Sequence, residues 1–392
     1  MRKTFINSVP QQWLLNSAGA PPNQEDAKIE FSLEPVVALS AVETLWRKLE
    51  AAGDNSFFVS WTWIGTWLRC LPEAVKPLLL TASRDGETVG AAILIERIQR
   101  RRFVVHVRQL HFNATGLPEL DCITIEHNGF AGDSSPGLWP AFLEWFARES
   151  GADELVVPGM ADGAIADMQG RMTLLHDVFK MPGFASALIF RDVEGVLGEL
   201  SSNTRQQLRR NLRALHQMGE LRCEAASTPG EAFETLAALK ELHIGSWGAR
   251  GKPHAFRWPF FEQFHRALIF EGLSKGSVQL LRVSAGTVIL GYLYNFRHRD
   301  REYAYQSGFD KSKSRLRPGY VSHLLAMTKS ASVGETSYDF LAGDNRLKRT
   351  FGRKMYEMHW HRFSKPTFGL RLEMAARSAI RKLKVGRKRV AF

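Results

Sequence analysis

The fold of the C-terminal half follows from Tyr303-Ala-Tyr-Gln-Ser-Gly-Phe-Asp310 and from the Arg315-Leu-Arg-Pro-Gly-Tyr320 segment after it. The first stretch predicts a β-strand over 303–308, in which Tyr303 and Tyr305 lie on one face. Pro318-Gly319 then opens a predicted helix over 319–331, because proline is tolerated at the first helical position. A strand, a basic loop and a helix in this order are typical of helices layered on a sheet.

Two predicted β-hairpins, about 200 residues apart, share one layout. The first has strands over 77–83 and 88–96, joined by the polar turn Arg84-Asp85-Gly86-Glu87. The second has strands over 278–283 and 287–296, joined by Ser284-Ala285-Gly286. Both second strands contain an internal glycine, which suggests that one domain has been duplicated, although a match this short also arises by chance.

Helices are predicted around these hairpins. Apolar residues recur at three- and four-residue intervals over 41–51 and 57–71, which indicates amphipathic helices. Ser201-Ser202-Asn203 offers N-cap chemistry for a helix with a leucine stripe. That stripe consists of Leu208, Leu212 and Leu215, and further elements are expected as helices over 231–243 and 258–270 and a strand over 337–341.

These elements divide the chain of 392 residues into two domains with a boundary near residue 195. The predicted parts are a flexible arm over 1–28, an N-terminal domain over 29–195, a C-terminal domain over 196–368 and a basic tail over 369–392. The predicted fold class is α/β (α+β), with mixed, mostly antiparallel sheets flanked by helices.

Composition excludes several classes of protein. The longest apolar runs, such as 57–64, fall far short of the roughly 20 residues that cross a bilayer. The first twenty residues contain no apolar segment of a secretory signal, so we expect a cytoplasmic protein. Three separated cysteines and 12 histidines without ligand spacing argue against a disulfide framework and a metal site.

The net charge of +12 is concentrated in the tail, where residues 361–392 contain ten basic side chains and one acidic side chain. Residues from Arg371 onward predict a basic amphipathic helix, which would bind peripherally to an anionic membrane surface. The alternative is a solvated, frayed tail. Nucleic acid is not an expected partner, because the tail lacks interleaved aromatic residues.

Four stretches in the second half resemble the GNAT (Gcn5-related N-acetyltransferase) superfamily, specifically the BioF2-like or CelD-like group related to the Fem transferases. They are Arg205-Gln-Gln-Leu-Arg-Arg-Asn-Leu-Arg213; His243 with Trp247; 303–310 with Pro318-Gly319; and Tyr338-Asp-Phe-Leu-Ala-Gly-Asp344 with Lys348 and Phe351-Gly352. The resemblance implies tandem GNAT-like domains, of which the C-terminal one transfers an acyl group from acetyl-CoA or another acyl-CoA.

The segment before the helix at 319–331 offers a place for the diphosphate of coenzyme A. Helix N-termini attract phosphate through free N–H groups and partial positive charge. Arg315 and Arg317 add charge, and Gly319 and Tyr320 begin the helix, so these four residues are the candidate cofactor-binding set. The alternative is a helix start in which Pro318 and Gly319 only set the turn.

Acylation of an amine requires a proton acceptor and a donor for the oxyanion. Candidate catalytic residues are Asp339, Tyr305, Lys348 and Asp344, and candidate substrate-binding residues are His243, Trp247, Arg209 and Tyr303. Each has a structural alternative: the tyrosines as sheet packing, Asp344 with Lys348 as a loop ion pair, the arginines as a solvated helix face, and His243 with Trp247 as packed residues.

The predicted function is an N-acetyltransferase that acts on an amine of a cell-envelope or exopolysaccharide-related acceptor. Direct attack on the thioester is expected, because the cysteines lack an activating histidine motif. Two alternatives stay open: a Fem-like aminoacyl-tRNA-dependent transferase, and a non-catalytic GNAT-like accessory protein of polysaccharide (cellulose) biosynthesis. The substrate class depends on the resemblance.

Overall fold

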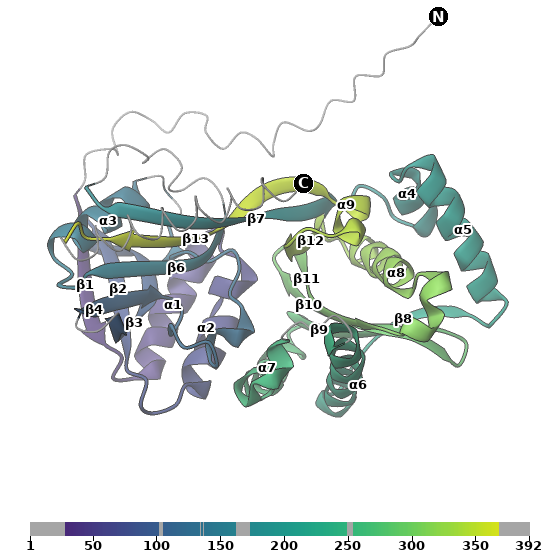
Figure 1. Ribbon diagram of the computed structural model, residues 1–392, viewed down its shortest axis with the longest axis horizontal. Helices are drawn as coiled ribbons and strands as arrows, with labels where there is room; N and C mark the ends of the chain where they lie inside the picture. Colours follow the sequence, from purple (N-terminus) through teal and green to yellow (C-terminus); the bar gives the residue numbers. More distant parts are fainter. Residues whose placement is uncertain are drawn as a thin grey trace, which may run out of the picture.

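The computed structural model describes residues 28–101, 105–133, 135, 137–161, 173–248 and 254–367. The predicted arm up to residue 27 and the predicted tail over 369–392 lie outside the described residues. The described strands form one 13-stranded sheet, in the order β1-β2-β3-β4-β6-β13-β7-β12-β11-β10-β9-β8, with β5 paired to β3. Helices cover both faces of this sheet, so the predicted mixed α/β fold class is confirmed (Figure 1).

The first half supplies seven strands and three α-helices of the described residues. The strands are β1 (Ile29–Pro35), β2 (Pro77–Arg84), β3 (Glu87–Arg101), β4 (Val105–Phe112), β5 (Ala131–Gly132), β6 (Glu154–Ala161) and β7 (Leu175–Ala187). The helices are α1 (Leu39–Ala52), α2 (Trp61–Cys70) and α3 (Leu138–Arg148), with short 3₁₀ helices at Phe57–Val59 and Asp121–Ile123.

The second half supplies the remaining elements of the described chain. Its helices are α4 (Val193–Gly198), α5 (Ser202–His216), α6 (Pro229–Gly248), α7 (Pro259–Gly272), α8 (Pro318–Ser332) and α9 (Arg346–Phe351), with 3₁₀ helices at Ala255–Arg257 and Lys311–Leu316. Its strands are β8 (Leu221–Ala225), β9 (Val278–Ala285), β10 (Val288–His298), β11 (Arg301–Phe309), β12 (Ser337–Ala342) and β13 (Arg353–Ser364).

Both predicted hairpins form. In the first, Asp85 and Gly86 have φ of 52° and 81°, which is the two-residue turn that matches the twist of the flanking strands. The predicted helix over 57–71 is interrupted instead: the extended backbone of Ser60 ends a 3₁₀ turn, and its side chain accepts the Trp63 N–H to cap α2. Helical periodicity alone does not mark such a cap.

Strand β13 joins the two halves. It lies between β6 and β7, and its pairing with β7 runs from Arg353 opposite Ala185 to Ser364 opposite Leu175. Figure 1 shows β7 and β13 running together along both halves. The last strand of the chain therefore completes the sheet of the first half, while β7 extends the sheet of the second half by pairing with β12.

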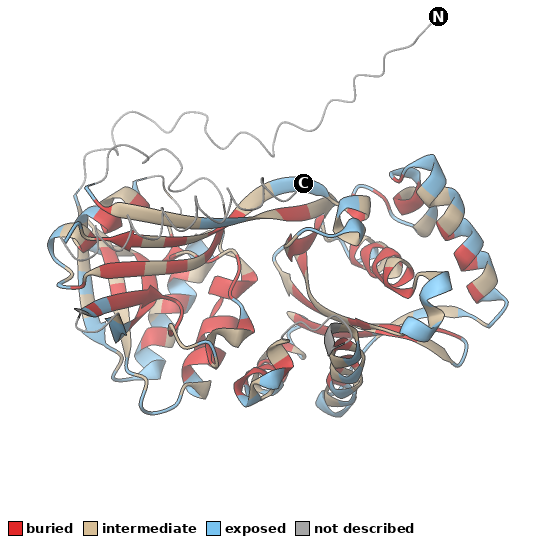
Figure 2. Cartoon of the chain, in the orientation of Figure 1, coloured by how far each residue is buried: buried red, intermediate tan, exposed pale blue. Residues whose placement is uncertain are grey.

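The apolar interior also continues across the two halves. Phe57 stacks on Phe296 of β10 with ring centroids 4.4 Å apart, and Trp63 meets Phe264 of α7 edge-on at 4.8 Å. These rings are buried, and Figure 2 shows buried residues wherever helices face the sheet. The aromatic stretch of the first half thus packs directly on β10 and α7 of the second half.

Helices α6 and α7 lie on one face of the second-half sheet, and α4, α5 and α8 lie on the other (Figure 1). The predicted leucine stripe of α5 is buried in this second layer, since Leu208 and Leu215 are fully covered. None of the helices in the described part of the chain is long and apolar enough to cross a membrane.

Candidate functional site

The site begins where two parallel strands separate. Strands β11 and β12 pair only over Arg301–Tyr303 with Ser337–Asp339. Beyond this point β11 stays paired to β10, and β12 stays paired to β7 as far as Ala342. A pocket of about 660 Å³ opens between the diverging strands, and its walls include residues 304–309 of β11, the following residues 310 and 311, and 340–342 of β12.

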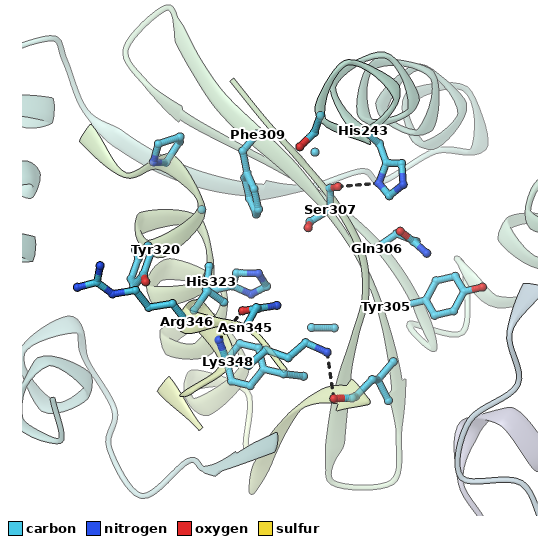
Figure 3. A pocket seen from close by; sticks show the side chains of 18 of the residues that line it. His243, Tyr305, Gln306, Ser307, Phe309, Tyr320, His323, Asn345, Arg346 and Lys348 are labelled. Carbon is cyan, nitrogen blue, oxygen red and sulfur yellow. Dashed lines mark hydrogen bonds between the residues drawn. The ribbon is translucent and has the colours of Figure 1, made fainter. Parts of the chain in front are cut away.

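The pocket collects side chains from distant parts of the chain (Figure 3). Its walls come from α6, β11, the start of α8, the end of β12 and α9, together with Thr124 and Glu126 of the first half. Six of the twelve predicted site residues line it: Tyr305, Lys348, His243, Arg317, Gly319 and Tyr320.

Part of the pocket wall is basic. Lys311, Arg317 and Arg346 line it, and the Arg317 guanidinium lies 5.3 Å from the centre of the Tyr320 ring. Arg317 has a left-handed backbone, with φ of 53°, and directly precedes α8. Pro318 has no N–H, and the Tyr320 N–H donates to Arg317 O. Of the N–H groups at residues 318–320, the one that remains for a ligand is that of Gly319.

Gly319 lies close to Phe309 and Leu347 in the pocket wall. A Cβ atom at this position would be 3.0 Å from the Phe309 ring and 3.4 Å from Leu347. The absence of a side chain therefore keeps the helix start open to a ligand. Arg315, the fourth member of the predicted set, is not on the pocket wall.

The pocket wall also contains a buried carboxylate and a half-buried amine. Glu126 accepts the Ala342 N–H at 2.7 Å, and burial raises the pKa of its carboxyl group. Lys348 donates to the carbonyl oxygens of Leu341 and Ala342 at 3.0 and 2.6 Å. Burial lowers the pKa of Lys348, while the negative charges of Glu126 and Asp339 oppose that shift.

Asp339 anchors the strand end that carries this site rather than lining the pocket. Its carboxylate accepts from the Tyr356 hydroxyl at 2.8 Å and from the Leu341 N–H at 2.7 Å, and it pairs with His127 Nε2 at 2.9 Å. His127 and Leu341 both have left-handed backbones, with φ of 47° and 63°. Strained residues of this kind persist where their surroundings hold them, and they concentrate at functional sites.

Three other predicted residues lie away from the pocket wall. Asp344 forms an exposed ion pair with Arg349 rather than with Lys348, and Arg209 pairs with Glu194 on an exposed face of α5. Tyr303 is buried beside His127, with ring centroids 5.7 Å apart. The rings of Tyr303 and Tyr305 both pack on Phe58. The two tyrosines therefore lie on one face of β11, as predicted.

The remaining candidates lie on the side of α6. His243 lines the pocket, its Nδ1 is 3.2 Å from Ser307 O, and burial lowers the pKa of its imidazole. The side chain of Trp247 lies outside the described residues. The Tyr305 hydroxyl donates to Ile123 O, which ties β11 to the first half next to Glu126.

Sequence reasoning missed several residues of the site: Glu126, His127, His323, Arg346 and Tyr356. Glu126 and His127 lie in a segment without regular structure, so no periodic pattern marks them. Their proximity to Asp339 and Lys348 depends on contacts more than 200 residues apart in sequence. The one local hint is an acid and an imidazole next to each other after Ile125.

The described thiols are poor nucleophiles. Burial raises the pKa of Cys122 and of Cys223 to about 12, and burial also raises the pKa of Cys70. Within the described ranges, no three His, Cys, Asp or Glu side chains are arranged to hold a metal ion. The pocket wall carries carboxylate, amine and imidazole groups, those of Glu126, Lys348, His243 and His323.

Comparison with known proteins agrees with this geometry. Residues 202–349 match the family described as acetyltransferase (GNAT) domain. The fold is similar to the crystal structure of FemX, with a TM-score of 0.55 at 12% identity over 84% of this chain and 96% of that chain. It is also similar to a conserved protein of unknown function from Bacteroides thetaiotaomicron VPI-5482, with a TM-score of 0.50 at 10% identity over 86% of this chain and 100% of that chain. No curated protein sequence matches the chain.

These findings define the class of the protein. Residues 202–349 form a domain of the GNAT acetyltransferase kind, and the fold over most of the chain is similar to that of FemX. The family resemblance drawn from the sequence is therefore confirmed at the level of the superfamily and the fold.

Proposed function

We propose that the protein transfers an acyl group, in the first instance acetyl, from acyl-CoA to an amine in the pocket between β11 and β12. The observation that carries this proposal is the opening between two parallel strands, whose lining combines three basic side chains with Glu126 and Lys348. We assign the basic residues to the donor phosphates, as the basic end, and Glu126 with Lys348 to the reaction, as the inner end. The GNAT domain match supports coenzyme A as the carrier.

The residues of the basic end fit the diphosphate of coenzyme A. Lys311, Arg317 and Arg346 would neutralise its charge, and the Gly319 N–H at the start of α8 points along the favourable direction of the helix dipole. The narrow acyl arm of the cofactor would then extend between β11 and β12 toward Glu126.

The proposed chemistry at the inner end is direct transfer. The Glu126 carboxylate accepts a proton from the amine, whose nitrogen forms a bond to the acyl carbon, and the carbon–sulfur bond then breaks to release the thiolate of coenzyme A. A raised pKa suits Glu126 to this task, because a base works best when its pKa lies near the working pH. The ammonium of Lys348 at the same end favours the negative charge that develops on the acyl oxygen.

A calorimetric titration tests the donor. Wild-type protein should bind acetyl-CoA and CoA saturably, and Gly319→Glu should abolish binding by placing a bulky anion against Phe309 at the phosphate site. Gly319→Ala is the steric control, since it adds only the Cβ contact, and it should weaken binding much less. No binding by wild-type protein would contradict the proposal and favour an aminoacyl-tRNA donor or a non-catalytic accessory role.

We further propose that the acceptor amine belongs to a cell-envelope or exopolysaccharide precursor, on the basis of the family resemblance. A screen of amino sugars and amino-acid amines for release of CoA from acetyl-CoA tests this class. The sequence of residues 371–392 supports peripheral binding to anionic membranes. Deletion of these residues should release the protein from vesicles that contain phosphatidylglycerol and leave acetyl-CoA binding unchanged; equal vesicle binding would contradict the anchor.

A further inference from the structure

A chain of hydrogen bonds runs through the second-half core and ends at the pocket. Arg297 Nε pairs with Glu302 Oε2 at 2.9 Å, and Asn295 Nδ2 donates to Glu302 Oε1 at 2.5 Å. Asn295 Nδ2 also donates to the Tyr338 hydroxyl at 3.2 Å, which in turn lies 3.0 Å from His323 Nδ1. Glu302, Asn295, Tyr338 and His323 are all buried.

The ion pair of Arg297 with Glu302 determines which atom donates and which accepts in each of these hydrogen bonds. Glu302, paired with that guanidinium, accepts from Ser330 and Asn295, so the Asn295 amide must present its nitrogen to the carboxylate. Turning the amide over would bring its oxygen against the carboxylate. The structure keeps the observed orientation even though Asn295 Oδ1 has no partner within the described residues.

The tautomer of His323 follows from this direction. The Tyr338 hydroxyl accepts from Asn295, so its single proton is available for its other neighbour, His323 Nδ1. Burial raises the pKa of Tyr338 well above its usual range and keeps that proton in place. Because His323 Nδ1 accepts a hydrogen bond, a neutral imidazole must carry its proton on Nε2.

His323 presents that second nitrogen to the pocket. Its side chain lines the wall from α8, and Figure 3 shows the imidazole pointing from the helix toward β11. Phe309 and Phe340 flank the ring, with centroids 5.9 and 5.3 Å away. Nε2 has no hydrogen-bond partner in the part of the chain that the structure describes.

The imidazole stays neutral over the working range of pH. Burial lowers the pKa of His323 to about 3, and the nearby positive charge of Lys348 adds to this shift. A neutral ring with a defined tautomer offers one fixed donor, in contrast to an imidazolium, which offers two.

We infer that His323 donates its Nε2–H to a carbonyl oxygen of the acyl-pantetheine arm of the donor, and that Tyr338, Asn295 and Glu302 act as positioning residues that fix this donor. The inference rests on the proposed function, because the arm must lie between β11 and β12. No proton leaves the imidazole: the contact is a hydrogen bond to either the thioester carbonyl or an amide carbonyl of the arm. A fixed donor at this point selects a carbonyl group and disfavours an N–H group.

Nitrogen NMR of the protein without ligand tests the tautomer. In ¹⁵N-labelled wild-type protein, His323 should show a protonated Nε2 and an unprotonated Nδ1, assigned by comparison with His323→Gln. Tyr338→Phe removes the hydroxyl that specifies the tautomer and should give a mixture of both forms. A protonated Nδ1 in the wild-type protein would overturn the inference, whatever the protein binds.

Titration with acetyl-CoA tests the contact. His323→Ala should weaken binding roughly 10- to 100-fold, the effect of one buried hydrogen bond. His323→Gln, which places an amide N–H near the position of Nε2, should recover much of that loss. Tyr294→Phe is a matched control, because Tyr294 and His265 form a similar buried pair that does not line the pocket, and binding should be unchanged.

Infrared spectra of bound, ¹³C-labelled acetyl-CoA distinguish the two kinds of carbonyl. A label in the thioester carbonyl or in the pantetheine amides should show a lowered stretching frequency that His323→Ala abolishes and His323→Gln retains. Binding without any His323-dependent shift would overturn the inference and leave the proposed function intact. No binding of acetyl-CoA to wild-type protein would instead reject the proposed function.

Discussion

At the residue scale, the site places ionisable groups where their contact with water is reduced. Glu126 is buried among backbone groups of β12 and close to Lys348, and each shift in pKa opposes the charged form. Such groups cost stability, and their arrangement suits the transfer of a proton.

The substitution Glu126→Gln should lower kcat/KM for acyl transfer by about 10²- to 10⁴-fold, because it removes the proposed base. A fall in wild-type activity as pH drops through the raised pKa of Glu126 should vanish in the variant. The pH dependence of CoA release from acetyl-CoA, with the acceptor identified by screening, provides the measurement. Wild-type turnover by the variant would remove Glu126 from the mechanism.

The same substitution should raise stability at neutral and alkaline pH. Since the folded state holds the proton of Glu126 more tightly than the unfolded state does, unfolding releases it, and stability falls as pH rises from the ordinary glutamate pKa through the raised one. Glutamine has no charge to bury, so the melting temperature of Glu126→Gln should exceed that of wild type at pH 8 and approach it near pH 4. The opposite order would contradict the direction of the pKa shift.

The substitution Lys348→Met should lower kcat by roughly 10²-fold or more, as expected for loss of a charge that stabilises an oxyanion. Lys311→Met, at the basic end, is the matched control and should mainly raise KM for acetyl-CoA. Circular dichroism would establish that both variants remain folded. Equal effects on kcat from both lysines would argue against the division of the pocket into a binding end and a reacting end.

At the element scale, the segment over 124–128 positions Glu126 by its close contact with β6. Asn128 N–H donates to Gly159 O, and the Asn128 side chain donates to Pro158 O, both at 2.8 Å. A Cβ atom on Gly159 would lie 2.1 Å from Ile125 O, and its φ is 66°. Only glycine allows this approach of loop and strand.

The substitution Gly159→Ala should therefore displace the loop, lower acyl transfer through Glu126, and reduce the free energy of unfolding by about 1–3 kcal/mol through backbone strain. Gly198→Ala is a matched control, because a Cβ atom there meets nothing within 4 Å. Urea unfolding and kcat/KM would be measured for both. Unchanged activity in Gly159→Ala would show that the loop does not position the base.

At the scale of the whole molecule, β13 makes the two halves one structural unit. It pairs with β6 and β7 at once, and the aromatic contacts of Phe57 and Trp63 with β10 and α7 bury a shared interior. The pocket also needs both halves, since Glu126 comes from the first and Lys348 from the second.

Urea unfolding should accordingly show one cooperative transition. Tryptophan fluorescence, which reports mainly on the first half because most of the ten tryptophans precede residue 195, should superimpose on far-UV circular dichroism. Truncation after Gly352, which removes β13, should abolish both the transition and acetyl-CoA binding. Two separate transitions in the intact chain would contradict the single unit.

Sequence patterns predicted the local elements of this protein and the superfamily of its second half. Hairpins at Asp85-Gly86 and Gly286, the leucine stripe of α5 and the helix start at Pro318 depend on turn chemistry, periodicity and capping, which act between close neighbours in the chain. Tyr305 and Lys348 were found in the same way, because each lies beside a recognisable strand or helix end.

Long-range packing determined the rest of the site. The separation of β11 from β12, the insertion of β13, the contact of Glu126 with Ala342 and the tautomer of His323 all depend on residues brought together from distant parts of the chain. Turn propensity and periodicity carry no information about such pairs. The burial of the shared core brings the 124–128 segment to the pocket wall. That burial is a property of the folded chain and not of any local stretch of sequence.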